Sequence, residues 1–255
     1  MADLQLTAPP TLTKGLVGTV IKNSVAPENA ACNLAGSGTF SWLLAFDTAA
    51  GTLTTGGAKP VANPALGYSF VNEDFPVLGG TLPMAPVTLT APLGASCTVT
   101  SSAANLNLPV YLDAAATNAL VLPLRQARFT NVTVSGDHTC IGKYNAAGLN
   151  PADNCGATQQ IPAFLPGGKV DAFINLDQAD AVVIAPIQQT LCVVLSGDAT
   201  KYGDGGAPTS RCKRVSGKIV FPGDWCTATN QAATAQCSDA VRFAGAFAAS
   251  GMLIK

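Results

Sequence analysis

Residues 39–55 read TFSWLLAFDTAAGTLTT, and this stretch decides the fold class. Its first part, residues 39–46, is apolar enough for a strand that is buried on both faces, with Trp42 in the core. Residues 47–51 have turn composition, because the closing glycine can take the positive φ that a tight turn requires. Residues 52–55 then return to an extended pattern. The stretch therefore predicts a β-hairpin with a buried first strand.

The same alternation continues outward from this hairpin, and helical periodicity is rare. Further strands are predicted at residues 16–21, 68–71, 87–90, 97–100, 110–112, 119–124, 127–134, 170–174, 218–221, 241–247 and 251–254. Turn residues recur about every ten positions, a spacing typical of a sandwich or jelly roll. We expect one mainly β domain over residues 1–255, a disulfide-stapled β-sandwich or jelly-roll-like fold with one or two short helices.

The clearest helical signal lies between Asp177 and Gly197. Asp177 suits the first turn of a helix, and Gly197 suits its C-cap. The valines of this segment fit a buried strand equally well. Residues 143–168, rich in Gly, Asn and Pro, form either the longest loop or a seam within the domain.

Eight cysteines carry the strongest information about the compartment. They are Cys32, Cys97, Cys140, Cys155, Cys192, Cys212, Cys226 and Cys237. No two form a CxxC, the close pair that structural zinc sites commonly use. The even count therefore favours disulfides over a metal site or buried free thiols, and with them an oxidising compartment. Cys140–Cys155 and Cys226–Cys237 are favoured pairs because each closes a short loop.

Composition excludes several classes of protein. Charged residues make up 11% of the chain and the net charge is −1, so no basic stripe is present for nucleic-acid binding. The basic residues within 211–218 are interpreted as a solvated turn. No run approaches the about 20 apolar residues of a membrane-spanning helix. The first residues lack a signal-peptide pattern, so we expect a trimmed precursor located outside the cell, in the periplasm or on the outer cell surface.

Catalytic chemistry has little support in this sequence. His138 is the only histidine, and no GxSxG motif places a nucleophilic serine. We expect no catalytic residues, and no cofactor with the exception of calcium. Asp198 and Asp204 lie in Gly-containing loops whose hard oxygen ligands suit Ca²⁺. Plain turns are the alternative interpretation of both loops.

Two aromatic residues are candidates for ligand binding, because an exposed flat ring can stack on a sugar ring. Trp225 lies beside Cys226, and Tyr68 lies in a loop-rich stretch. For Trp225 the alternative is packing against the disulfide of its neighbour.

Three stretches, FSWLL (40–44), TTGG (54–57) and DHTCIG (137–142), resemble uncharacterised cysteine-bearing bacterial secreted proteins and lipoproteins. The lipid-attachment cysteine of such lipoproteins lies upstream of the mature domain. The resemblance implies a cell-surface or envelope location and assigns no functional residues.

We therefore expect a non-catalytic extracytoplasmic surface protein that binds a glycan or a protein. One alternative is a structural, self-associating surface protein, because low charge lets surfaces pack without repulsion. The other is a secreted hydrolase, which requires a cleft where His138 or two acids converge.

Overall fold

The computed structural model describes residues 1–25, 28–29, 34–35, 37–94, 97–135, 140–144, 149–150, 156–157 and 164–255. It confirms a mainly β chain with short helices. The largest sheet has eight strands: its path runs β10-β11-β18-β25-β23-β24, and β1 and β13 also pair with β25. These strands are β1 (Asp3–Ala8), β10 (Ala104–Tyr111), β11 (Ala119–Thr130), β13 (Cys140–Ile141), β18 (Gly168–Asn175), β23 (Trp225–Cys226), β24 (Gln231–Ala232) and β25 (Ala240–Ser250).

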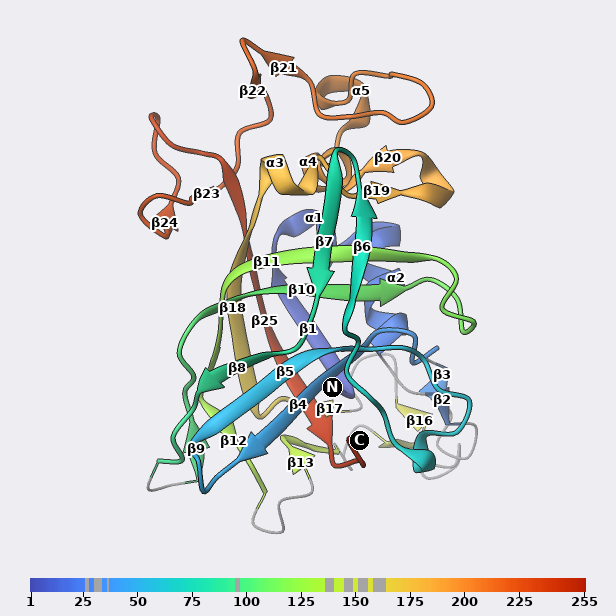
Figure 1. Cartoon of the computed structure of the whole chain (residues 1–255), viewed down its shortest axis with the longest axis vertical. Coiled ribbons are helices and arrows are strands. Elements are labelled where there is room, and N and C mark those ends of the chain that lie inside the picture. Colours follow the sequence, from blue (N-terminus) through green and yellow to red (C-terminus); the bar gives the residue numbers. More distant parts are fainter. Residues whose placement is uncertain are drawn as a thin grey trace.

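A second, three-stranded sheet packs across the first (Figure 1). It consists of β4 (Ser41–Asp47), β5 (Thr52–Ala58) and β8 (Val87–Thr90). β4 and β5 form the predicted hairpin, and Gly51 in its turn has φ of 63°. The two layers meet through buried rings: Trp42 of β4 lies edge-on to Phe129 of β11 at 5.7 Å between centroids, and Phe129 lies 5.9 Å from Phe247 of β25. Trp42 is fully buried in this core, as predicted.

The other strands of the described residues form two-stranded pairs. They are β2 (Glu28–Asn29) with β3 (Leu34–Ala35), β6 (Glu73–Val77) with β7 (Gly80–Met84), β9 (Thr98–Val99) with β12 (Val132–Thr133), β14 (Lys143–Tyr144) with β17 (Phe164–Leu165), β15 (Leu149–Asn150) with β16 (Gly156–Ala157), β19 (Val183–Ile184) with β20 (Gln189–Thr190), and β21 (Arg214–Val215) with β22 (Lys218–Ile219). The hairpin β6–β7 reaches the end of the molecule that carries α3 and α4 (Figure 1), where the Leu78 N–H donates to the Ala181 carbonyl at 2.9 Å.

The helices are short. They are α1 (Pro10–Thr13), α2 (Gly15–Val25), α3 (Leu176–Ala179), α4 (Leu191–Ser196) and α5 (Ala199–Tyr202), with 3-10 turns η2 (Pro64–Leu66) and η5 (Ala185–Ile187). The strand predicted at residues 16–21 is wrong, because this segment belongs to α2. Ile21 and Val25 are four positions apart, which places both on one helix face, and both are buried in the core. Within the described ranges, no helix is long and apolar enough to cross a membrane.

Two further expectations need correction. The strand predicted at 119–124 and the first part of the one predicted at 127–134 are a single strand, β11, because a bulge between Arg125 and Arg128 absorbs the break and Gln126 takes φ of 53°. The remainder of the second prediction contains β12, which pairs with β9. Residues 251–254 form no strand; Ile254 makes only an isolated bridge to Tyr68. The helical signal before Gly197 is confirmed for α4, where this glycine is the C-cap with φ of 69°.

The cysteines follow the prediction in part. Cys226–Cys237 is a disulfide, as predicted, and Cys192–Cys212 is another. The bridges expected at Cys97 and Cys140 are not formed, and both thiols are free. Residues 134 and 135, which follow β12, bond to both: the Cys97 carbonyl accepts from Val134 N–H and the Cys140 carbonyl accepts from Ser135 N–H. Cys32, Cys155 and His138 lie outside the described residues.

Candidate functional site

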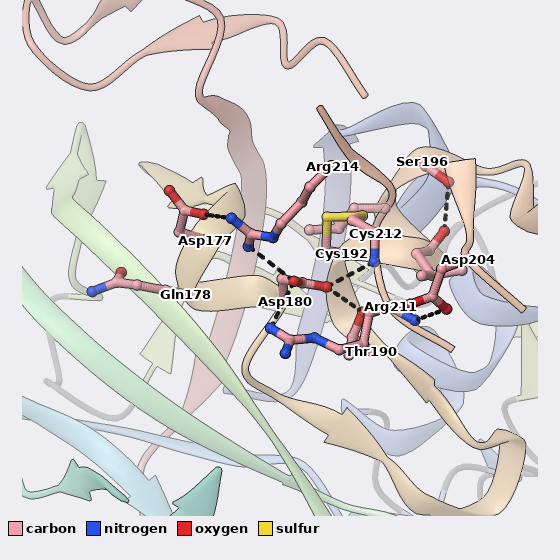
Figure 2. Close-up of a disulfide and its surroundings, with 12 residues drawn as sticks. Asp177, Gln178, Asp180, Thr190, Cys192, Ser196, Asp204, Arg211, Cys212 and Arg214 are labelled. Atoms are coloured by element: carbon pink, nitrogen blue, oxygen red, sulfur yellow. Dashed lines mark hydrogen bonds and ion pairs between the residues drawn. A yellow bond between two sulfur atoms is a disulfide. The ribbon is translucent and has the colours of Figure 1, made fainter. Parts of the chain in front are cut away.

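A fully buried carboxylate organises the disulfide-containing end of the molecule. Figure 2 shows the side chain of Asp180, directly after α3, surrounded by donors. Its Oδ1 accepts from the Thr190 hydroxyl at 3.1 Å and from the Cys212 backbone N–H at 2.8 Å. Its Oδ2 accepts from the guanidinium groups of Arg211 and Arg214, each at 2.9 Å. Four donors therefore compensate the cost of burying this charge.

The disulfide Cys192–Cys212 belongs to the same unit. It joins α4 to the residues that precede the β21–β22 hairpin, and Cys212 lies between the two arginines in sequence. Residues 211 and 213–218 are exposed, and those from 214 on form the β21–β22 hairpin, which agrees with the interpretation as a solvated turn. The guanidinium groups of Arg211 and Arg214 are in addition anchored on Asp180. Arg214 also pairs with the exposed carboxylate of Asp177 at 2.8 Å. The ion pairs of Asp177 and Asp180 therefore hold the end of α3 against the segment that the disulfide joins to α4.

On its other side α3 holds an arginine of the large sheet. Figure 2 shows Gln178 pointing away from the Asp180 cluster. The helix begins at the N-cap Asn175, whose side chain accepts from the Gln178 N–H at 3.1 Å. Gln178 Oε1 in turn accepts from Arg125 Nε at 2.7 Å, and Arg125 also donates to Asn107 Oδ1 at 3.0 Å. Burial lowers the pKa of the Arg125 guanidinium below its ordinary value.

The second disulfide positions a hydroxyl next to the same region. Cys226–Cys237 closes the loop that follows β23, and Thr227 comes directly after the first of these cysteines. Asp239 accepts from both the Thr227 N–H, at 2.9 Å, and the Thr227 hydroxyl. Each disulfide therefore supports one part of a common polar site.

These residues surround a hollow of about 340 Å³ that is open to solvent, which we call the amide hollow. Its lining consists of Asn105, Arg125, Gln126, Phe173, Asn175, Gln178 and Thr227. Phe173 lies on the sheet face opposite the core, because Ala172 and Ile174 on either side of it point into the core. It pairs across the sheet with Arg125 of β11 and Arg242 of β25. The hollow thus combines one aromatic ring with planar polar side chains.

In the amide hollow, the side-chain amide oxygens are engaged in hydrogen bonds within the described part of the protein, whereas the amide nitrogens are not. The side-chain oxygens of Asn105, Asn175 and Gln178 accept from Gln126 N–H, Gln178 N–H and Arg125 Nε. In the part of the chain that the structure describes, their side-chain nitrogens have no acceptor, and no carboxylate forms an ion pair with Arg125. The hollow therefore offers surplus hydrogen-bond donors and an uncompensated positive charge.

The two predicted aromatic residues lie in different places. Trp225 is half-buried, donates from Nε1 to Asn230 Oδ1 at 3.0 Å and lies 5.5 Å from the Arg242 guanidinium, which also pairs with Asp171. It is two residues from Thr227 but does not line the amide hollow. Tyr68 is buried, so the expectation that it is exposed is wrong. A ligand-binding role for either residue stays a prediction.

Tyr68 instead helps to line a larger cavity of about 440 Å³ at the other end of the molecule. We call it the β4 cavity, because the residues of β4 from Ser41 to Phe46 line it. Its other lining residues include Leu93, Val99 and the two free thiols of Cys97 and Cys140. Most of this lining is apolar.

The residues proposed for calcium serve as local backbone acceptors. Asp198 caps α5: its Oδ1 accepts from the Thr200 hydroxyl at 2.7 Å and from the Thr200 and Lys201 N–H groups, and these bonds, that of the hydroxyl first, lower its pKa. Asp204 accepts from Gly206 N–H at 2.9 Å and Arg211 N–H at 2.8 Å. The turn interpretation accounts for these bonds, and calcium binding stays a prediction.

Metal ligation has no other support among the described residues. Two groups each bring three potential metal ligands together, Asp180 with Cys192 and Cys212, and Asp239 with Cys226 and Cys237. Both pairs of sulfurs are joined in disulfides, and only thiolates bind metal ions well. No known protein family, no curated protein and no solved structure matches this chain. The geometry of the site is therefore the basis for a functional proposal.

Proposed function

We propose that this protein is a non-catalytic, extracytoplasmic binding module and that it binds an acidic glycan in the amide hollow. The two disulfides support a location in an oxidising compartment. The observation that carries the proposal is the hollow itself, where one aromatic ring, surplus amide donors and an unpaired guanidinium converge.

The composition of the hollow fits a sugar better than a purely apolar ligand. Sugars present hydroxyl groups around an apolar ring, and binding sites for such ligands combine an aromatic surface with a few convergent polar groups. Phe173, which is 5% exposed, supplies the aromatic part of the lining, and Asn105, Asn175 and Gln178 supply the amide nitrogens. Because the amide oxygens are already engaged, the free groups are donors, so the preferred ligand is rich in acceptors.

The charge of Arg125 narrows the ligand class. Its hydrogen-bond partners are the neutral oxygens of Gln178, Asn107 and Leu124. A partly buried guanidinium without a carboxylate is an energetic cost, and a carboxylate of the ligand would remove it through charge-assisted hydrogen bonds. A uronic acid or another carboxylate-bearing sugar supplies such a group. A neutral sugar does not.

The experiment compares two arginines of one strand. Calorimetric titration with an oligogalacturonate should show binding to the unmodified protein, and Arg125→Gln should weaken it at least about tenfold. The control is Arg128→Gln, because Arg128 donates to the Ser101 carbonyl and does not line the hollow. Its affinity should stay unchanged.

Two results would overturn the proposal. Equal binding of neutral and acidic oligosaccharides, unaffected by Arg125→Gln, would exclude the acidic class. An array of acidic and neutral glycans without any signal, for a protein whose disulfides are intact by mass, would exclude glycan binding in the hollow.

A further inference from the structure

We propose that the free edge of β4 binds an extended, apolar peptide of a partner polypeptide by strand addition. This inference does not depend on the amide hollow, which lies on the large sheet and at the other end of the molecule. It rests on two properties of the same strand, its backbone edge and the cavity beside it.

The direction of the backbone groups of β4 follows from two hydrogen bonds. The Leu43 carbonyl accepts from the Thr55 hydroxyl of β5 at 3.0 Å, so the backbone N–H and C=O groups of Leu43 point towards β5. The Trp42 carbonyl accepts from the amino group of Met1, so the backbone groups of Trp42 point away from β5. In an antiparallel sheet this direction alternates with each residue. Leu44 and Phe46 therefore turn their N–H and C=O groups away from β5.

This part of the edge is unpaired within the described residues. β4 pairs only with β5 in the sheet. At the beginning of the strand the edge is covered, because Phe40 N–H donates to the Ser24 carbonyl at 2.9 Å and Met1 occupies the Trp42 carbonyl. No described residue bonds to the outward groups of Leu44 or Phe46. As far as the structure describes the chain, two successive donor–acceptor sets, about 7 Å apart, are therefore unpaired, as the addition of a further strand requires.

The β4 cavity lies against the same strand. β4 lines it from Ser41 to Phe46, and the lining opposite includes Leu93, Val99 and Ile141. A strand laid along β4 would place alternate side chains in this space, where apolar side chains are removed from water. The unpaired edge therefore favours a ligand with an extended backbone, and the cavity favours a ligand with apolar side chains.

A peptide fits this combination better than a lipid or another small apolar molecule. An acyl chain could fill the cavity, but it would leave the N–H and C=O groups of Leu44 and Phe46 without partners next to an apolar surface, which is costly. An extended peptide satisfies both requirements at once, as in other cases of β-strand addition. In general, the unpaired N–H and C=O groups of an edge strand can pair with a strand of another chain.

The first test measures amide hydrogen exchange of the intact protein. The probe is the peptide acetyl-Lys-Val-Thr-Val-Thr-Val-Lys-amide, which alternates apolar and polar side chains. At saturation, exchange at the Leu44 and Phe46 amides should slow at least about tenfold, because both become hydrogen-bonded. The amide of Thr88, on the opposite edge strand β8 of the same sheet, should not change.

The second test uses matched proline variants. Phe46→Pro removes one donor from the free edge and should weaken peptide binding at least about tenfold. Thr88→Pro places the same change on the other edge of the sheet and should leave binding unchanged. If Phe46→Pro does not fold, the exchange measurement on the unmodified protein still decides.

Three outcomes would overturn the inference. The first is a saturating peptide that leaves Leu44 and Phe46 unprotected. The second is equal protection at Thr88, which would indicate non-specific association. The third is displacement of the peptide by dodecanoate together with binding of dodecanoate that protects neither amide, because the cavity would then be a site for acyl chains.

Discussion

The backbone N–H of Cys212 donates to Oδ1 of Asp180 at 2.8 Å, so the residue that closes a disulfide also satisfies a buried carboxylate. Asp180 follows α3 directly, and α3 carries Gln178, which holds Arg125 in the amide hollow. The covalent bond, the ion pairs and the proposed binding site therefore form one continuous chain of contacts. A change at Asp180 should be felt in both stability and binding.

Replacement of Asp180 should destabilise the fold strongly. Asp180→Ala leaves the buried Cys212 N–H and the Thr190 hydroxyl without their acceptor and releases two guanidinium groups. We expect the free energy of unfolding to fall by about 3 kcal/mol, the lower end for a broken buried ion pair, because the arginines can reach water. Urea denaturation with the disulfides intact measures this.

The control for this variant lies in the same helix. Asp177 pairs with Arg214, but its side chain is 69% exposed. An exposed ion pair contributes at most about 1 kcal/mol, so Asp177→Ala should have a small effect. Equal losses for the two variants would show that burial of the Asp180 carboxylate is not the cause.

The disulfides can be assigned directly by peptide mapping under non-reducing conditions. We expect linked peptides for Cys192–Cys212 and Cys226–Cys237. Cys97 is exposed and free, so a maleimide should label it in the native protein, and Cys140 should react more slowly because it is partly buried. A linked peptide that contains Cys97 would contradict this arrangement.

Local signals in the sequence predicted local structure. The hairpin of residues 39–55 depends on a turn and on the strands that flank it, and the structure has both. The disulfide Cys226–Cys237 closes a loop with a sequence separation of 11, and its loop length made it a favoured pair. The strand prediction for residues 16–21 is wrong, because β-branched residues are typical of strands. The segment is helical instead, and the helix buries Ile21 and Val25 on one face.

The candidate site depends on contacts between distant residues. Arg125 and Gln178 are 53 positions apart, and they meet because β11 pairs with β18 at Arg125 and α3 directly follows β18. Asp180 and Arg211 are separated by 31 positions. No spacing rule links such residues. The one available signal was the cluster of basic residues beside Cys212, whose charges require partners once that disulfide is buried.

Removal of the Tyr111 hydroxyl should stabilise the protein. Tyr111 is 2% exposed and packs with Val71, Met84 and Val121, and its hydroxyl has no hydrogen-bond partner among the described atoms. Burial, followed by the nearby charge of Glu73, raises its pKa to about 12. Since an unsatisfied buried polar group costs about 1–3 kcal/mol, Tyr111→Phe should raise the free energy of unfolding by about 1 kcal/mol. Chemical denaturation measures the change, and a loss of stability would indicate a partner for the hydroxyl.

The turn between β10 and β11 should make stability depend on acidic pH. The Asp113 carboxylate accepts from Thr117 N–H at 3.0 Å, and also from the Asn118 N–H and both side chains. These bonds, chiefly that from Thr117 N–H, lower its pKa from 3.8 to about 2. Because the folded pKa lies below the unfolded value, the contribution to stability is complete above about pH 4 and is lost as the pH falls towards 2.

Carboxyl carbon NMR titration tests this directly. The Asp113 midpoint should lie near 2, and Asp113→Asn should flatten the pH dependence of unfolding between pH 4 and 2. Thr117→Ala removes one hydroxyl donor but keeps both backbone donors, so it should raise the midpoint only slightly. A midpoint near 3.8 in the unmodified protein would mean that the turn does not hold the carboxylate in solution, because hydrogen bonds to the charged form must lower its pKa.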